Sequence, residues 1–250
     1  MHCLTRPAPR SRFGRAFSLV VVSAAVSCVT SVASAAVAGG KPVTLVVSYA
    51  PGGGADLMAR LLAPKMSEAL GQPVIVENKP GGAGQIAGAY VAKAAPDGAT
   101  LLVDASSFAV VPSLYPKMTY DPAKAFTPLA VLALFPNVLV ATPSFPAASV
   151  KDVIAMAKAK PGSVAYASSG NGSAQHLAGA LFEDVTKTDL LHVPYKGGGP
   201  AMLDVMGGQV PLFFANLASG SGKLKYQEPL ATHCDRSVSG LASMALGSPQ

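Results

Sequence analysis

The chain alternates short apolar runs with longer amphipathic stretches, and breaks rich in glycine and proline separate them. Residues 43–48 form a continuous apolar run, which is typical of a strand buried on both faces of a parallel sheet. After the break at residues 51–54, leucines and methionines recur at helical spacing over residues 57–70, and Gly71 ends that segment. The pattern predicts a strand followed by a helix.

The same order continues along the next part of the chain. Residues 73–76 predict a second strand, residues 86–94 a second helix and residues 101–103 a third strand. A strand–helix–strand–helix–strand order predicts a parallel sheet with right-handed crossovers.

A second block of strands and helices follows the proline-rich residues 115–128. Its predicted strands are residues 138–141, 164–167, 190–193 and 210–214. Its predicted helices carry apolar positions over residues 150–157, 177–185 and 202–206. Ser149 is the expected N-cap of the first of these helices. Beyond about residue 220 the pattern decays, and it predicts no closing element.

The chain therefore consists of two α/β units of similar size. In such folds a ligand binds at the carboxyl ends of the strands, and two units add a cleft between them.

Composition and charge exclude two broad classes of protein. Of the 250 residues, 50% are hydrophobic and 13% are charged, which excludes an intrinsically disordered chain. The formal charge of +6 would suggest a nucleic-acid partner if it were spread over the folded part. Four of the 19 Lys and Arg residues, however, lie within residues 1–15, and the remaining 15 face 13 acidic residues without clustering. We therefore expect no nucleic-acid partner.

Residues 1–36 have the features of a secretory signal peptide. A basic start, an apolar run over residues 16–32 and small residues follow in the required order, and cleavage is expected after Ala35 or Ala38. The alternative is a transmembrane anchor, but polar residues interrupt a run that is already marginal for the ~20 apolar residues of a span. Export leaves Cys234 as the one cysteine, so no internal disulfide is expected. The four histidines show no metal-ligand spacing, and neither a metal nor a cofactor is predicted.

Three strand-to-helix junctions are rich in glycine and polar residues: residues 49–56, 168–176 and 192–200. Free backbone N–H groups at a helix N-terminus attract anions, and glycine lets a ligand approach the backbone. After export, Arg60 and Arg236 are the only arginines left in the chain. Helix ends and hydroxyl groups are therefore the main available anion receptors. Ordinary tight turns, a serine N-cap and a solvated lysine are the alternative interpretations of these junctions.

Two enzyme classes fit parts of the junctions. Gly52 and Gly54 follow a strand as in a dinucleotide-binding fingerprint, but the third glycine of that fingerprint would fall at Leu57. Ser173 and His176 are near each other in sequence, as a hydrolase would need, but no nucleophile elbow of the form G-x-S-x-G surrounds the serine.

Nine runs spread over residues 42–217 are specific when they are taken together. They are residues 46–56, 71–82, 95–98, 120–122, 136–138, 157–162, 169–179, 192–197 and 207–210. In this order behind a signal peptide, they resemble the periplasmic substrate-binding receptors of tripartite tricarboxylate transporters, the Bug family. The resemblance implies an α/β, periplasmic-binding-protein-like (Venus flytrap) fold with two lobes, residues 37–130 and 131–224.

The resemblance also implies a function. A receptor of this family is a periplasmic solute-binding protein and not an enzyme. It binds a small mono-, di- or tricarboxylic acid and delivers it to the membrane permease subunits of the transporter. We expect a monomer without a cofactor.

In the family, backbone amides and hydroxyls of a second-lobe loop hold a ligand carboxylate, and a first-lobe glycine loop faces the rest of the ligand. The corresponding ligand-binding residues here are Gly52, Gly53, Gly54, Asp56, Ser106, Ser107, Ser169, Asn171, Gly172, Ser173, Tyr195 and Asn216. The family commonly has Asp-Asn at the end of the late strand, where this chain has Ala215 and Asn216. The missing acid favours a plain carboxylic acid over an amino acid as the ligand.

The resemblance does not extend to the tail, residues 225–250. Family members continue for tens of residues and return through the hinge to complete the first lobe. We therefore expect an incomplete first lobe, as in a truncated or frameshifted product. Two alternatives to the receptor function remain open at this point: an exported serine hydrolase and a nonfunctional remnant of the receptor.

Overall fold

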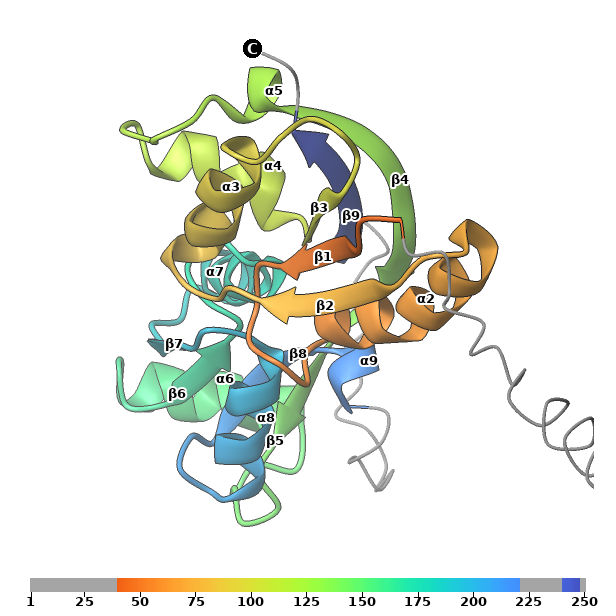
Figure 1. Ribbon diagram of the computed structural model, residues 1–250. Coiled ribbons are helices and arrows are strands. Elements are labelled where there is room, and N and C mark those ends of the chain that lie inside the picture. The colour runs from red at the N-terminus through yellow and green to blue at the C-terminus, as the bar shows by residue number, and fades with distance from the viewer. Residues whose placement is uncertain (1–39, 221–239, 248–250) are drawn as a thin grey trace, which may run out of the picture. The chain divides into compact units, whose positions relative to one another are not determined.

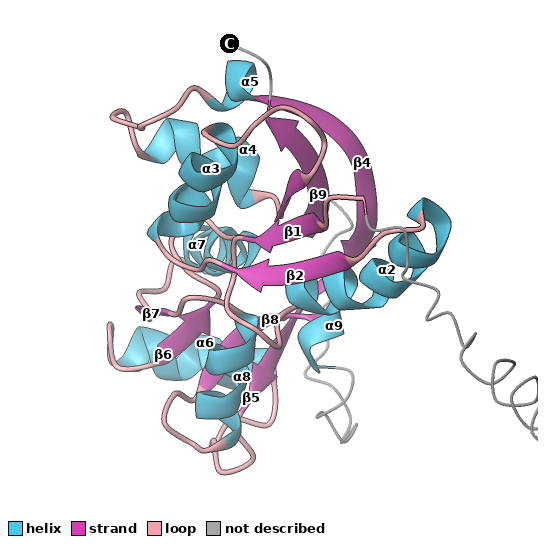
Figure 2. Cartoon of the chain, in the orientation of Figure 1, coloured by secondary structure: helices cyan, strands magenta, loops and turns pink. Residues whose placement is uncertain are grey.

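The computed structural model describes residues 40–220 and 240–247, which belong to a unit that runs from Gly39 to Gln250. Two β-sheets with helices against their faces make up this part of the chain (Figure 1 and Figure 2). The predicted signal peptide lies outside the described residues. Among the described helices, none combines the length and the apolar character of a membrane span.

The first sheet begins with the elements that the sequence predicts. They are β1 (Val43–Val47), α2 (Gly54–Leu70), β2 (Val74–Asn78), the 3₁₀ turn η1 (Gly82–Gly84), α3 (Gln85–Ala92) and β3 (Thr100–Asp104). Strand β1 pairs in parallel with both β2 and β3, so the predicted strand–helix–strand–helix–strand order is confirmed. We refer to this sheet and its helices as the first lobe.

Strand β1 is buried on both faces. Leu45 and Val47 pack against Ala59 of α2 on one face. Val46 packs against Val91 of α3 on the other face. Helices α2 and α3 therefore cover opposite faces of the sheet (Figure 1), as the continuous apolar run predicts.

Two further strands complete the first sheet in the order β2-β1-β3-β9-β4: β4 (Phe126–Phe135) and β9 (Gly240–Gly247). The sequence pattern predicts neither of them. Strand β4 contains Pro128, two register irregularities and mostly exposed side chains, so it lacks the alternation that identifies a strand. It also carries the first lobe to Phe135, beyond the predicted boundary at residue 130.

Strand β9 corrects the expectation for the tail. It pairs antiparallel with both β3 and β4, so residues 240–247 do form an element, although residues 225–250 show no period. The backbone hydrogen bonds of a strand between two others hold it without a strong sequence pattern.

The second sheet and its connecting helices include every strand and helix that the sequence predicts for the second block. They are β5 (Asn137–Ala141), α6 (Val150–Ala159), β6 (Ala165–Ser168), α7 (Ala174–Thr186), β7 (Leu191–Pro194), α8 (Gly198–Met206) and β8 (Leu212–Asn216). The strand order is β5-β8-β6-β7, and β5 is antiparallel to β8. The Ser149 side chain accepts a hydrogen bond from Asp152 N, which confirms the predicted N-cap of α6. We refer to this sheet and its helices as the second lobe.

The hydrophobic pattern does not predict three short helices: α4 (Ser107–Leu114), α5 (Pro122–Ala125) and α9 (Leu217–Gly220). Helices α5 and α9 have four residues each, too few for a helical repeat, and Pro112 interrupts α4.

The ring of Tyr166 fills the core of the second lobe. It lies edge-on to Phe214 and stacks on His192. Gly179 of α7 lies directly against this ring, and a methyl group at that position would overlap it. The glycine therefore sets how closely α7 approaches β6, and with it the position of the loop that joins them.

We expect Gly179→Ala to lower the free energy of unfolding by about 1–3 kcal/mol, because the added methyl group must displace a closely packed ring. Ala180→Ser, at an exposed position of the same helix, should change this free energy by less than about 0.5 kcal/mol. Denaturant unfolding of both variants and the parent measures the difference. A Gly179→Ala variant as stable as the parent would contradict the packing described.

Candidate functional site

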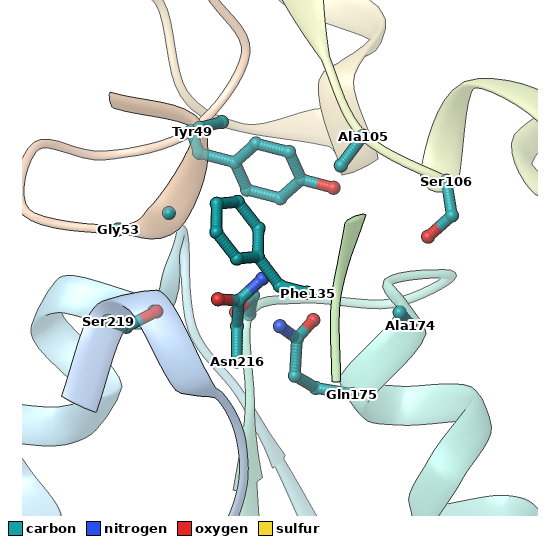
Figure 3. Close-up of a pocket in the computed structure, with 13 residues that line it drawn as sticks. Tyr49, Gly53, Ala105, Ser106, Phe135, Ala174, Gln175, Asn216 and Ser219 are labelled. Carbon is teal, nitrogen blue, oxygen red and sulfur yellow. The ribbon is translucent and has the colours of Figure 1, made fainter. Parts of the chain in front are cut away.

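A cavity lies where the carboxyl ends of strands from the two sheets face each other. It has about 460 Å³ of free space, a figure that includes the part open to solvent. The residues that line it (Figure 3) are Tyr49, Gly53, Gly54, Ala55, Ala105, Ser106, Phe135, Ser169, Ala174, Gln175, Gly198, Asn216 and Ser219. None of these described residues carries a charged side chain.

Four helices begin at this cavity. Gly54 is the first residue of α2, Ser106 is the N-cap of α4, Ala174 is the first residue of α7 and Gly198 is the first residue of α8. The first N–H groups of a helix have no carbonyl partner within the helix, and they carry the positive end of its dipole. A negatively charged ligand is therefore favoured, although the described lining holds no cation.

Hydroxyl and amide side chains complete the wall. The hydroxyl groups of Ser106 and Ser219 are buried and have no hydrogen-bond partner within the described residues. The amide groups of Gln175 and Asn216 point into the same space (Figure 3). A buried hydroxyl without a partner costs about 1–3 kcal/mol, so a ligand that bonds these groups gains from satisfying them.

The structure brings seven of the twelve expected ligand-binding residues to this region. Five of them line the cavity: Gly53, Gly54, Ser106, Ser169 and Asn216. Two line a neighbouring hollow that shares Tyr49 and Ser169 with the cavity: Asn171 and Tyr195. The other five line neither space: Gly52, Asp56, Ser107, Gly172 and Ser173.

Asp56 stabilises the first glycine junction by hydrogen bonds and does not line the cavity. Its buried carboxylate accepts hydrogen bonds from Gly52 N (2.9 Å), Arg60 Nε (3.0 Å) and Asn78 Nδ2 (2.9 Å). Burial opposes ionisation of Asp56, but the hydrogen bonds from these three groups outweigh it and lower its pKa. The carboxylate is thus occupied within its own lobe.

Ser107 belongs to a buried network at the end of β3. The oxygen Oδ1 of Asp104 accepts hydrogen bonds from Ser48 Oγ (2.7 Å), Ser107 Oγ (3.0 Å) and Ala105 N (2.7 Å). Burial raises the pKa of Asp104, and these three hydrogen bonds oppose the shift. The Tyr49 hydroxyl lies 2.6 Å from Ser107 Oγ, so the network reaches the cavity wall through the Tyr49 ring.

Ser173 and His176 do not form the nucleophile–base pair that a hydrolase needs. Ser173 Oγ accepts a hydrogen bond from the backbone N of His176 (3.2 Å), which confirms the N-cap interpretation of this serine. The His176 ring instead accepts a hydrogen bond from Gly172 N at Nδ1 (3.1 Å). Within the described residues there is also no group of three or more His, Cys, Asp or Glu side chains that could hold a metal ion.

The first and third glycine junctions contact each other through their backbones. Ala50 N donates a hydrogen bond to Lys196 O (2.9 Å), which joins the first lobe to the second. A methyl group at Gly199 would overlap Pro51 O, and one at Gly197 would lie 2.9 Å from Ala50 N. Glycine is therefore required here by the close approach of two main chains.

Sequence reasoning missed several lining residues. Gln175 lies within the second junction, where its polar side chain next to the N-cap was the available signal. Phe135 belongs to the unpredicted strand β4, and Ser219 to the short helix α9, so neither had a pattern that placed it. Tyr49 lies within the first junction, whose pattern assigns it no role.

Among known protein families, the sequence model described as the tripartite tricarboxylate transporter family receptor matches residues 58–230 of this chain. BugT of Bordetella pertussis is 40% identical over 179 residues, which are 71% of this chain and 55% of BugT. The chain spans about half the length of the curated relatives it matches.

Solved structures agree with the fold. A protein of R. palustris solved with adipate is 34% identical with a TM-score of 0.76, covering 82% of this chain and 76% of that chain. MatC from Rhodopseudomonas palustris with bound malate is 29% identical with a TM-score of 0.74, covering 82% of this chain and 78% of that chain. The likeness to periplasmic binding proteins confirms the predicted α/β fold.

The Asp104 network leads to a pH-dependent prediction. Because burial raises the folded-state pKa of Asp104, the folded chain is favoured when this carboxyl is protonated and loses stability as pH rises through that pKa. Asn at this position still offers one oxygen to the three donors. We expect Asp104→Asn to be more stable than the parent near pH 8 and to match it near pH 4.

Unfolding of both proteins against pH measures this difference. Asp184→Asn, at an exposed ion pair, should stay within about 0.5 kcal/mol of the parent throughout. A parent that is more stable than Asp104→Asn at high pH would show that the ionised carboxylate stabilises the network.

Proposed function

Because the chain belongs to the tripartite tricarboxylate transporter receptor family, we propose that it is a solute receptor that binds a small carboxylate between its two lobes. The ligand is a mono-, di- or tricarboxylic acid, which the receptor passes to membrane permease subunits. The observation that carries this proposal is the cavity, in which four helix N-termini surround a described lining without charged side chains.

Recognition replaces the hydration shell of the carboxylate with backbone N–H groups, hydroxyls and amides. We assign direct ligand contact to Gly53, Gly54, Ser106, Ser169, Gln175 and Asn216. Asn171 and Tyr195 reach the ligand from the neighbouring hollow. The remaining expected residues support the site from behind: Gly52, Asp56, Ser107, Gly172 and Ser173.

The neutral wall supports a plain carboxylic acid as the ligand. A ligand ammonium group would lose its hydration without gaining a counter-charge, because no carboxylate is among the described lining residues. The two solved relatives described above were obtained with adipate and malate, neither of which carries an amine.

Ligand capture works by closure. The lobes each contribute helix N-termini to the cavity, so a ligand that contacts both favours the closed arrangement, which then docks on the permease. The receptor acts in the periplasm after export, as a monomer, and catalyses no reaction. The N-cap role of Ser173 supports this over a serine hydrolase.

We expect adipate or malate to raise the midpoint of thermal unfolding of the full chain, because a ligand that binds only the folded state stabilises it. The diamine with the chain length of adipate should give no shift. If no acid shifts the midpoint, the receptor function is contradicted. A chain without any cooperative unfolding transition would instead support the nonfunctional remnant.

Ser169→Ala tests the site itself. A hydrogen bond to a charged group contributes about 1.5–3 kcal/mol, so the variant should bind the same acid about tenfold more weakly or worse. Ser163→Ala, at an exposed position in the same lobe, should bind like the parent. Titration calorimetry compares the three proteins, and equal affinities would remove Ser169 from the site.

A further inference from the structure

Two histidine rings lie behind the loop that joins β6 to α7. His192 belongs to β7, and His176 belongs to the first turn of α7. Their rings stack face to face, with centroids 4.3 Å apart and planes inclined by 17°. Neither ring lines the cavity or the neighbouring hollow, so neither is placed to touch the ligand.

Each ring bonds one end of the loop. At the start, His192 Nε2 lies 2.7 Å from Ser168 Oγ, and that hydroxyl also accepts a hydrogen bond from Gly170 N (3.1 Å). At the end, Gly172 N donates to His176 Nδ1 (3.1 Å). The stacked rings therefore connect the two ends of the loop.

The segment between these two anchors carries groups of the candidate site. Ser169 lines both the cavity and the hollow, and Asn171 lines the hollow. Gly170 and Gly172 both have positive φ, and a methyl group at Gly170 would approach Tyr195 O to 2.9 Å. The segment is anchored at both ends, and its two glycines adopt backbone angles that other residues rarely take.

Proton uptake would break this arrangement. Nδ1 of His176 accepts a hydrogen bond, which it can do only while it is unprotonated. A proton there would set one N–H group against another, at Gly172. A second charge on His192 would lie one ring-stacking distance away and repel the first.

The surroundings of the pair keep both rings uncharged at neutral pH. Burial lowers the pKa of His176, while the charge of Glu183 on the same helix opposes the shift. Burial, followed by the effect of His176, lowers the pKa of His192 to about 4. Tyr166 of β6 covers the His192 ring at a centroid distance of 5.0 Å, and its own hydroxyl faces Glu183. Protonation of the pair therefore belongs to the acid range below the ordinary pKa of histidine.

We propose that His176 and His192 are positioning residues for the ligand-binding loop, which they hold only while both rings are uncharged, so that acid pH weakens ligand binding. This inference rests on the proposed function, because it assigns the loop a part in carboxylate binding. It makes ligand affinity dependent on groups that do not contact the ligand.

Matched substitutions separate the hydrogen bonds from the charge. In His176→Asn the side-chain oxygen can take the place of Nδ1, and in His192→Gln the amide can take the place of Nε2, yet neither residue titrates. The variant with both changes should bind adipate like the parent near pH 7.5. Between about pH 7.5 and 4.0 the parent should lose about threefold more affinity than this variant, whose own loss reports protonation of adipate.

His176→Leu removes the acceptor at every pH and should weaken adipate binding about tenfold even near pH 7.5. Thermal unfolding of each variant shows whether it is folded. Equal pH dependence of the parent and the double variant would overturn the inference while leaving the receptor function intact.

A ligand-free measurement keeps the inference testable if the proposed function fails. If adipate does not bind the parent at any pH, the function is contradicted, and NMR of the free full chain still reports the histidine pair. We expect the ring signals of His176 and His192 to titrate below the ordinary value, with the Gly172 amide signal shifting at the His176 midpoint. Ordinary titration, or a Gly172 amide that ignores it, would overturn the inference.

Discussion

The positive ends of four helix dipoles meet in the cavity between the two sheets, and no described lining residue adds a formal charge to them. One helix terminus contributes about 0.3–1 kcal/mol toward an anion, so several must act on the same space to replace an arginine. This requirement explains why parallel strands from both lobes end at the cavity, and why each is followed by a short junction and then a helix. The rest of the fold holds the first residues of these helices around the same cavity.

Negative charge close to such a site would repel an anionic ligand. The two buried carboxyl groups nearby have pKa values shifted in opposite directions. Asp56 remains ionised because Arg60, Gly52 N and Asn78 surround it. Asp104 has no such cation, and its burial favours the uncharged form. In both cases the carboxyl organises a junction while its field at the cavity is reduced. Neither Asp56 nor Asp104 lines the cavity, and each holds a chain segment beside it through hydrogen bonds.

The sequence predicted the strands and helices whose burial leaves a clear hydrophobic pattern, either a continuous apolar run or a helical repeat. It did not predict the elements without such a pattern. The run that became β1 is buried on both faces, and the helices of the second lobe keep an apolar stripe, so their order and the junctions between them could be predicted. Strand β4 is largely exposed and irregular, and β9 lies in a stretch without a repeat, so both were missed. Phe135 and Ser219 were missed with their elements. The roles of Asp104 and Gln175 depend on which strand ends face each other, which is tertiary information.

The backbone contact between the first and third glycine junctions bears on how fast a ligand leaves. The hydrogen bond from Ala50 N to Lys196 O runs from one lobe to the other beside the cavity, and it must break whenever the lobes part at this point. Its rupture, together with the loss of close packing at Gly197 and Gly199, adds to the barrier for opening without involving the ligand. In the proposed receptor, the residence time of a bound molecule is then set in part by main-chain atoms that are the same for every ligand, while the cavity wall selects the ligand.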